Sequence, residues 1–192
     1  MNMSLLKRIL MICFYVLVIV SCKQKSKEQI ELEEYKLKIK TTIEKMESDN
    51  LKKGVNNQSV YLGVDSIHKI GLRQYVNRPK LFLYFSSNTC SSCIDETVEI
   101  TERVFPNYKK NEGIVFISPD YPARFRINCY GKKLLNLEKG KLGLPLENST
   151  EPPFFIVIDS TMQVKSIHVV NKMNFDRTEI YLNGLAKSFD FK

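Results

Sequence analysis

The sequence predicts an α/β fold, and three apolar runs carry that prediction. Leu81–Phe85 and Gly113–Ser118 have the length of buried strands, and a helical pattern of apolar residues lies between them. A strand, a crossover helix and a second strand form a βαβ unit, which is normally parallel and right-handed. Phe154–Asp159 is the third run, and it opens behind a proline, which strands tolerate at their start. We expect the element order β-α-β-α-β-β-α from residue 81 onward.

Length and composition indicate one globular domain with additional N-terminal elements. The chain has 192 residues, of which 43% are hydrophobic and 26% charged. Its net charge of +8 fits a basic surface, including one that lies near anionic lipid. The lysines are spread along the chain and no nucleic-acid-binding motif is present, so we expect no nucleic-acid partner. The five cysteines are an odd number, and each therefore needs its own explanation.

The first residues have the three parts of a secretory signal. A basic start precedes Ile9–Val20, a continuous apolar run that is short for a bilayer span. The segment ends in Ile-Val-Ser-Cys22, which resembles the lipobox of bacterial lipoproteins. That resemblance implies that residues 1–21 are a cleaved signal peptide and that lipid on Cys22 anchors the chain to a membrane. An uncleaved membrane anchor is the alternative, and both interpretations place the remaining chain outside the cytoplasm.

Residues 22–54 are predicted to form the lipidated N-terminus and a helical tether. After a short polar linker, apolar residues recur at spacings of three and four and form a narrow stripe. The stripe consists of Leu32, Tyr35, Ile39, Ile43 and Met46. It is too short to support a coiled coil, so we favour a helix that lies on the domain or acts as a spacer over a dimerisation helix. Asn50 and Gly54 are expected to end it.

The domain is predicted to occupy residues 55–192. Before its first long strand, Val60–Leu62 has the pattern of a short edge strand. Asp65–Val76 is expected to form a brief helix, which Pro79 stops.

After the βαβ unit, Ala123–Leu137 is expected to be helical, although Gly131 lowers the helix propensity there. The β-branched content of Gln163–Val170 predicts a strand, in which His168 is a strand-face residue rather than a catalytic one. A final amphipathic helix is expected to begin at Asn174 or Asp176.

Two cysteines, Cys90 and Cys93, follow the first long strand at the start of a helical pattern. Unpaired N–H groups and the helix dipole favour an anion at a helix N-terminus, so this position favours a thiolate. A two-residue spacing brings both sulfurs within bonding reach, which predicts a reactive dithiol. A structural disulfide is an alternative in an oxidising compartment. A metal site needs further ligands, and Cys129 and His168 stand at no recognised spacing, so we expect no metal.

The strand, the Cys90-Ser-Ser-Cys93 motif and Pro153 before a further strand together resemble the thioredoxin fold. The resemblance is closer to the membrane-tethered TlpA/ResA-like thiol-disulfide oxidoreductases and covers about residues 55–192. It implies a three-layer α/β/α sandwich with a mixed sheet, preceded by the helical tether. It also implies exchange of a dithiol and a disulfide without a cofactor.

The resemblance gives a role to each of four residues. Cys90 matches the attacking cysteine, and Cys93 matches the resolving one. Pro153 matches the cis-proline that offers backbone to an extended substrate, and Glu96 matches a glutamate that assists proton transfer. The chain departs from the family pattern at several neighbouring positions. They are Thr89 in place of an aromatic residue, Ser91 and Ser92 between the cysteines, and Tyr84 where thioredoxin has a buried acid.

The sequence therefore predicts a lipoprotein thiol-disulfide oxidoreductase of the bacterial cell envelope. Its expected partners are a protein disulfide or dithiol substrate, an envelope electron donor and, through lipid on Cys22, a membrane. The absence of an acidic residue after Cys22 favours the outer membrane, facing the periplasm. The alternative is a non-catalytic binding module in which Cys90 and Cys93 form a structural disulfide. Peroxidase chemistry is disfavoured, because Leu83 and Tyr84 stand where that chemistry uses a proline.

Overall fold

The computed structural model describes residues 11, 26–61, 69–120, 129–148, 152–189 and 191. The leader with its Cys22 lipidation position therefore lies outside the described residues. The chain divides into two compact units, Met1–Thr42 and Ile43–Lys192. Among the described residues, no helix combines the length and the apolar character that a bilayer span requires.

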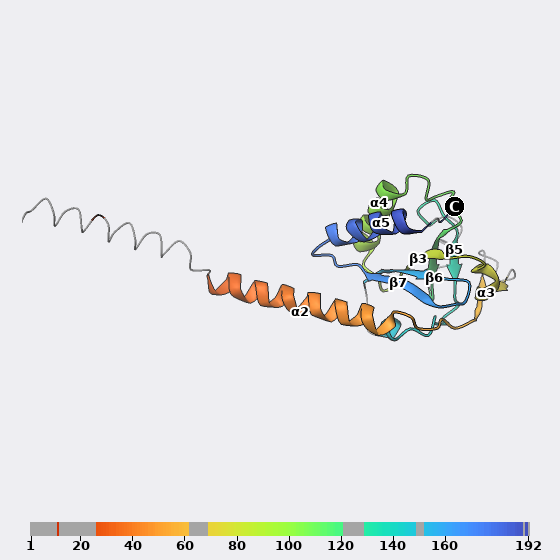
Figure 1. The fold of residues 1–192 in the computed structure, drawn as a ribbon, viewed down its shortest axis with the longest axis horizontal. Helices are drawn as coiled ribbons and strands as arrows, with labels where there is room; N and C mark the ends of the chain where they lie inside the picture. Colours follow the sequence, from red (N-terminus) through yellow and green to blue (C-terminus); the bar gives the residue numbers. More distant parts are fainter. Residues whose placement is uncertain are drawn as a thin grey trace, which may run out of the picture. The chain divides into compact units, whose positions relative to one another are not determined.

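The described part of the first unit is the beginning of helix α2 (Lys27–Asn50), drawn in orange in Figure 1. Ser26 and Gln29 form a capping box at its start. The Gln29 N–H donates to Ser26 Oγ over 3.2 Å, and the Ser26 N–H donates to Gln29 Oε1 over 3.1 Å. In this part of the predicted stripe, Leu32 and Tyr35 are 46% and 55% exposed. The predicted helix is confirmed.

The second unit is built around a mixed seven-stranded sheet in the order β2-β1-β5-β4-β3-β6-β7. The strands are β1 (Ser59–Tyr61), β2 (Lys69–Gly71), β3 (Lys80–Tyr84), β4 (Ile114–Ser118), β5 (Leu134–Asn136), β6 (Phe154–Ile158) and β7 (Val164–Val169). Strand β3 is parallel to β4 and antiparallel to β6. The predicted βαβ unit and the closing hairpin of β6 and β7 are thus confirmed.

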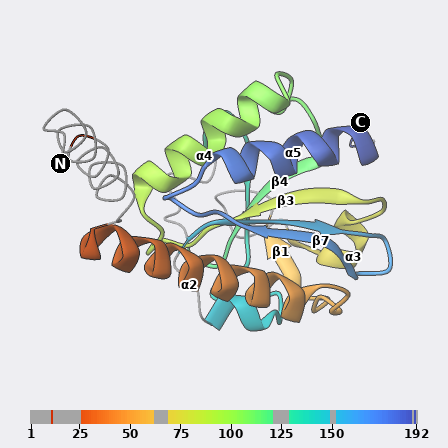
Figure 2. The same cartoon turned by 60° about the vertical axis from the view of Figure 1, so that its left-hand side comes forward.

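Helices α4 (Ser91–Val104) and α5 (Asp176–Ser188) lie side by side on one face of the sheet (Figure 1). Side chains of β3 alternate between the two faces, as the strand pleat requires. Leu81 and Leu83 pack in the core under α4 and α5, whereas Phe82 and Tyr84 pack in the core on the opposite face. Figure 2 shows from a second direction that the two helices lie on the same side of the sheet.

The last turns of α2 belong to the second unit and help to cover the opposite face of the sheet. Ile43 and Met46 pack against the core there. Asn50 is buried, and its Oδ1 accepts a hydrogen bond of 3.2 Å from the Leu146 N–H in the 3-10 turn η2 (Pro145–Asn148). Helices on one face and the α2 end with η2 on the other give the three-layer α/β/α arrangement that was predicted.

The helix expected over Ala123–Leu137 is wrong for the part that the structure describes. Cys129 and Lys132 form an antiparallel bridge, and strand β5 follows them. Between them, Tyr130 and Gly131 have φ angles of 52° and 80°. Two successive positive φ angles give a two-residue hairpin turn, and a glycine adopts such an angle without a steric cost. The turn geometry therefore overrides the helical pattern, and the residues before Cys129 lie outside the described ones.

Two shorter elements also differ from expectation. Of the helix expected over Asp65–Val76, the described part is helical only in α3 (Leu72–Tyr75), because the three residues before it pair with β1 as strand β2. Residues 62–68, with His68, lie outside the description. The strand expected at Val60–Leu62 is present as β1, but it lies between β2 and β5 and is not an edge strand.

Candidate active site

The cysteines lie where β3 passes into α4, and a tight turn sets the angle between the two elements. The Thr89 N–H donates to the Ser86 carbonyl over 3.1 Å, and the Ser86 N–H donates to Thr89 Oγ1 over 3.0 Å. Thr89 is buried, and its hydroxyl oxygen gives the Ser86 N–H a hydrogen-bond acceptor at a position that solvent does not reach. Thr89 therefore has a structural role in this turn.

A second contact holds this turn to the end of β4. The Ser87 N–H donates to Asp120 Oδ1 over 2.8 Å, and the Ser87 hydroxyl donates to Asp120 Oδ2 over 2.7 Å. Both carboxylate oxygens are thus used, and hydrogen bonds to a charged acceptor are stronger than neutral ones. The contact fixes the segment that leads into Cys90.

Cys90 is the N-cap residue of α4 and is exposed. Its sulfur accepts a hydrogen bond of 3.4 Å from the Cys93 N–H, and it lies 3.0 Å from Ser92 Oγ. Hydrogen bonds from the Cys93 thiol, the Ser92 hydroxyl and the Cys93 N–H lower the pKa of Cys90 to about 7. At neutral pH a large fraction of Cys90 is therefore thiolate, the nucleophilic form.

Cys93 lies one turn into α4 and is only 7% exposed. Burial raises its pKa to about 11, and the hydrogen bond to Cys90 and the charge of Cys90 act in the same direction. The charge of Lys172, in the connection from β7 to α5, acts in the opposite direction. The two cysteines are thus strongly unequal, with one exposed and acidic and one buried and protonated.

Pro153 directly precedes strand β6 and is buried. Its carbonyl accepts a hydrogen bond of 3.0 Å from the Val170 N–H, and the next residue, Phe154, stacks on Tyr84 with 4.5 Å between ring centroids. The resemblance to a cis-proline position is wrong in this respect, because the Pro152–Pro153 bond is trans. The described residues contain no cis peptide bond. The trans form is the favoured one for an X–Pro bond.

Glu96 is half-buried on α4, and the structure does not place it among the groups that shift the pKa of either cysteine. It interacts electrostatically with Arg103 further along the helix. Arg103 also pairs with Glu99 and Glu179 over 3.1 Å and 3.0 Å. The role of Glu96 in proton transfer stays a prediction.

The structure adds two residues that sequence reasoning did not single out as functional. In the sequence, Ser92 is distinctive only because the thioredoxin-like proteins that the motif resembles usually have other residues between the cysteines. In the structure, its hydroxyl contacts the Cys90 sulfur. Lys172 is distant from the cysteines in sequence. It is an exposed lysine outside any motif, so the sequence contains no pattern that links it to the site. Tyr84 is buried, and its pKa is raised above the usual range. Burial is the largest cause, and the charge of Glu147 and its hydrogen bond add to it.

One further cysteine and one histidine in the described part of the chain lie in the core. Cys129 is buried, and burial raises its pKa to about 12, so it remains a thiol at neutral pH. His168 is also buried, where its Nε2 lies 2.9 Å from Thr178 Oγ1 and its Nδ1 lies 3.4 Å from Glu47 Oε1. Within the described ranges, no group of three or more His, Cys, Asp or Glu side chains is placed to hold a metal ion.

No protein-family model matches the chain, and no curated protein matches its sequence. Among solved structures, a cysteine-to-serine mutant of PrxQ from Xylella fastidiosa is 13% identical with a TM-score of 0.51. That match covers 72% of this chain and 96% of the other. Together with the mixed sheet and the CxxC motif between β3 and α4, it supports one conclusion. The fold is thioredoxin-like.

Two further solved structures resemble the chain. A thioredoxin-like protein from Porphyromonas gingivalis is 14% identical with a TM-score of 0.49, and the match covers 73% of this chain and 97% of that one. A thiol:disulfide interchange protein from a Bacteroides species is 16% identical with a TM-score of 0.42, over 70% of this chain and 93% of that one.

Proposed function

We propose that the chain is a thiol-disulfide oxidoreductase that exchanges its Cys90 and Cys93 dithiol with disulfides of protein substrates. The observation that carries the proposal is the inequality of the two thiols at the start of α4. The pKa of exposed Cys90 is lowered to about 7, whereas that of buried Cys93 is raised to about 11. Disulfide exchange needs an accessible thiolate and a second thiol that attacks later.

In the first step, the Cys90 thiolate attacks one sulfur of the substrate disulfide. The substrate S–S bond breaks, a Cys90–substrate disulfide forms, and the other substrate sulfur leaves as a thiolate that takes a proton from solvent. Cys93 does not compete in this step, because it is buried and protonated at neutral pH.

In the second step, Cys93 loses its proton and attacks the Cys90 sulfur. The Cys90–substrate bond breaks, the Cys90–Cys93 disulfide forms, and the substrate is released as a dithiol that has gained two electrons and two protons. Burial is the main reason that the pKa of Cys93 is high, but the charge of Cys90 and its hydrogen bond contribute. Both contributions vanish once Cys90 is in the mixed disulfide. Formation of the first disulfide therefore makes Cys93 easier to deprotonate.

The backbone of Pro152 and Pro153 can accept hydrogen bonds but cannot donate them. Neither Pro152 nor Pro153 has an N–H, and the Pro153 carbonyl already accepts from Val170. Pro152 is exposed whereas Pro153 is buried, so the Pro152 carbonyl is the group of this pair that an extended substrate would contact, and it can only accept. A substrate that docks here would donate a backbone N–H to it.

The same proposal includes the location of the enzyme. The Ile-Val-Ser-Cys22 sequence supports cleavage before Cys22, lipidation of that residue and attachment to the envelope, with the outer membrane and the periplasmic side favoured. Mass spectrometry of the mature N-terminus after expression in a bacterial host tests this part. An unmodified Cys22 would refute the anchoring without bearing on the redox chemistry.

The catalytic part is tested with the full chain in an insulin-reduction assay driven by dithiothreitol. We expect Cys90→Ser to abolish the catalysed rate and Cys93→Ser to trap a mixed disulfide with insulin. Cys129→Ser is the matched control, since it removes a thiol that burial keeps protonated. Activity retained by Cys90→Ser would disprove the proposal. The absence of a reversible dithiol-disulfide couple would favour the binding module with a structural disulfide.

A further inference from the structure

A second candidate site lies at the opposite end of the central strands from the cysteines. Strand β3 runs from Lys80 toward the turn before Cys90, and β4 lies parallel to it. At the beginning of these strands, the connection from α4 to β4 and the hairpin after Cys129 line an open pocket of about 270 Å³. We call it the lysine pocket, because Lys109, Lys110, Lys132 and Lys133 line it.

Two ammonium groups are built into this region rather than extended into water. The half-buried Lys132 Nζ donates to the carbonyl oxygens of Tyr108 and Asn111 over 2.6 Å and 2.8 Å. Lys80 does not line the pocket and is only 5% exposed. Its Nζ donates to the Glu112 carbonyl over 3.0 Å and lies 5.0 Å from the ring centroid of Tyr75.

The charges of the pocket are not balanced. Glu112 is the one carboxylate among the residues that line it, whereas four of the lining residues are lysines. Of these, Lys109 is paired with Glu102, which is outside the lining set, over 2.8 Å. Burial and the charge of Lys80 lower the pKa of Lys132 to about 8, and the charge of Glu112 offsets them only in part. Partly buried cations that contact mainly neutral acceptors are stabilised by an added anion.

We propose that the lysine pocket binds a phosphate-bearing anion through the ammonium groups of Lys132, Lys110 and Lys133. Lysine ammonium groups bind phosphate as compact point charges, without the planar geometry that arginine imposes. The volume of about 270 Å³ suits a phosphate or diphosphate group rather than a large organic ligand. This site is separate from the dithiol, and the proposal does not depend on the exchange reaction.

The phosphate has two sources with the same chemistry, a free anion in solution or the headgroup of an anionic lipid. Titration calorimetry of the full chain in detergent with inorganic phosphate and pyrophosphate detects the first source. Flotation with vesicles of phosphatidylcholine, with and without phosphatidylglycerol, detects the second. Binding in either arm supports the proposal only when it depends on the lysines of the pocket.

Two variants remove the charges in different ways. Lys132→Met removes the half-buried ammonium, and we expect it to weaken binding about tenfold, because a hydrogen bond to a charged group is lost. Since that lysine also holds two backbone carbonyls, the double variant Lys110→Met with Lys133→Met tests the site through exposed side chains only. We expect that double variant to weaken binding about tenfold as well.

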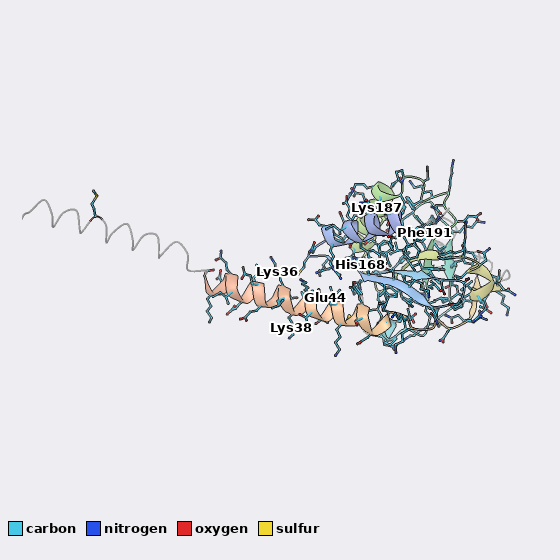
Figure 3. The ribbon with its side chains drawn as sticks, in the orientation of Figure 1. Lys36, Lys38, Glu44, His168, Lys187 and Phe191 are labelled. Atoms are coloured by element: carbon cyan, nitrogen blue, oxygen red, sulfur yellow. The ribbon has the colours of Figure 1, made fainter. Side chains whose placement is uncertain are left out.

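The matched control is Lys36→Met with Lys38→Met, two exposed lysines of α2 that do not line the pocket and are labelled in Figure 3. It removes the same charge and should bind like the unmodified chain. Far-UV circular dichroism and thermal unfolding of each variant confirm that the domain is folded. The proposal is overturned if neither pyrophosphate nor anionic vesicles bind at about millimolar concentration. It is equally overturned if the control double variant weakens binding as much as the pocket double variant.

Discussion

The Ser92 hydroxyl oxygen lies 3.0 Å from the Cys90 sulfur, within the first turn of α4. Together with the Cys93 thiol, it supplies hydrogen bonds that favour the Cys90 thiolate. Ser92 therefore takes part in tuning the nucleophile. In this chain the tuning comes from local hydrogen bonds at a helix N-terminus, a position that already favours an anion.

Replacing Ser92 with alanine should raise the pKa of Cys90 and lower its reactivity. For a rise of one unit from a pKa of about 7, the thiolate fraction at pH 7 falls about fivefold. The rate of iodoacetamide alkylation, measured between pH 5 and 10, reports the pKa directly. In the unmodified chain, half-maximal reactivity is expected near pH 7, with reactivity lost as the pH falls below it. Ser91→Ala is the control, and equal effects of both substitutions would contradict the contact.

Lys172 should assist the second step of exchange. Burial is the largest cause of the high pKa of Cys93, and the charge of Lys172 opposes it. Because this lysine is exposed and screened by salt, we expect Lys172→Met to slow release of the mixed disulfide only about two- to fivefold. Rapid quenching followed by gel electrophoresis measures how long the mixed disulfide persists. Lys69→Met, at an exposed position of β2, should leave its lifetime unchanged, and an equal effect there would remove the assigned role.

The cluster of Glu47, His168 and Arg177 should make the domain less stable in acid. Figure 3 labels His168 on the strand that contacts the last turns of α2. Burial holds its pKa below 6.5, because the folded state disfavours the charged ring despite Glu47. The unfolded state then binds more protons, so the free energy of unfolding falls as the pH drops below about 6.5.

Glu47 extends that acid effect to lower pH. Burial raises its pKa, but the hydrogen bonds from His168, Arg177 and the Val169 N–H outweigh burial and lower it below 4.5. Its stabilising contribution is therefore present above pH 4.5 and is lost as the pH falls through the lower folded value. Glu47→Gln should cost about 2 kcal/mol at pH 7 and flatten the acid dependence, measured by urea unfolding. Asp49→Asn, at an exposed position on the same helix, is the control. A change below about 0.5 kcal/mol for Glu47→Gln would contradict a stabilising cluster.

Two glycine substitutions should have opposite effects. A Cβ at Gly113, just before β4, would lie 1.9 Å from the carbonyl oxygen of Phe191, so the C-terminal segment would have to move. Gly113→Ala should therefore destabilise the domain by about 1–3 kcal/mol. A Cβ at Gly184 within α5 meets nothing within 4 Å, and Gly184→Ala should stabilise the helix by about 0.5–1 kcal/mol. Thermal unfolding distinguishes the two, and a shift of the same sign in both would refute the argument.

The sequence predicts the centre of this fold well because the central strands are buried on both faces. Every residue of β3, β4 and β6 is buried, so each strand reads as a continuous apolar run. The position of Cys90 and Cys93 follows from the boundary between β3 and the amphipathic pattern of α4. These features are local, and local patterns are what a single sequence reveals.

The errors arise where long-range contacts or turn geometry decide the structure. The hairpin at Tyr130 and Gly131 depends on two positive φ angles, which a helical apolar pattern conceals. The short strand β2 forms because it pairs with β1. The charge of Lys172 acts on the pKa of Cys93 because the pairing of β6 with β7 determines where the connection to α5 begins. No spacing rule along the chain predicts that contact.

Tyr84 is unsuited to accept the proton that Cys93 gives up. The resemblance to thioredoxin places a buried acid at this position, but burial and Glu147 raise the pKa of the tyrosine well above neutrality. Its phenol therefore stays protonated in the working pH range and cannot accept that proton. Two routes remain for the proton, the predicted one through Glu96 and one to bases dissolved in the solvent. If dissolved bases take the proton, the resolving rate increases with buffer concentration at constant pH and ionic strength, a kinetic signature of general base catalysis from solution. A rate that is independent of buffer and is lowered by Glu96→Gln would assign the proton to Glu96 instead.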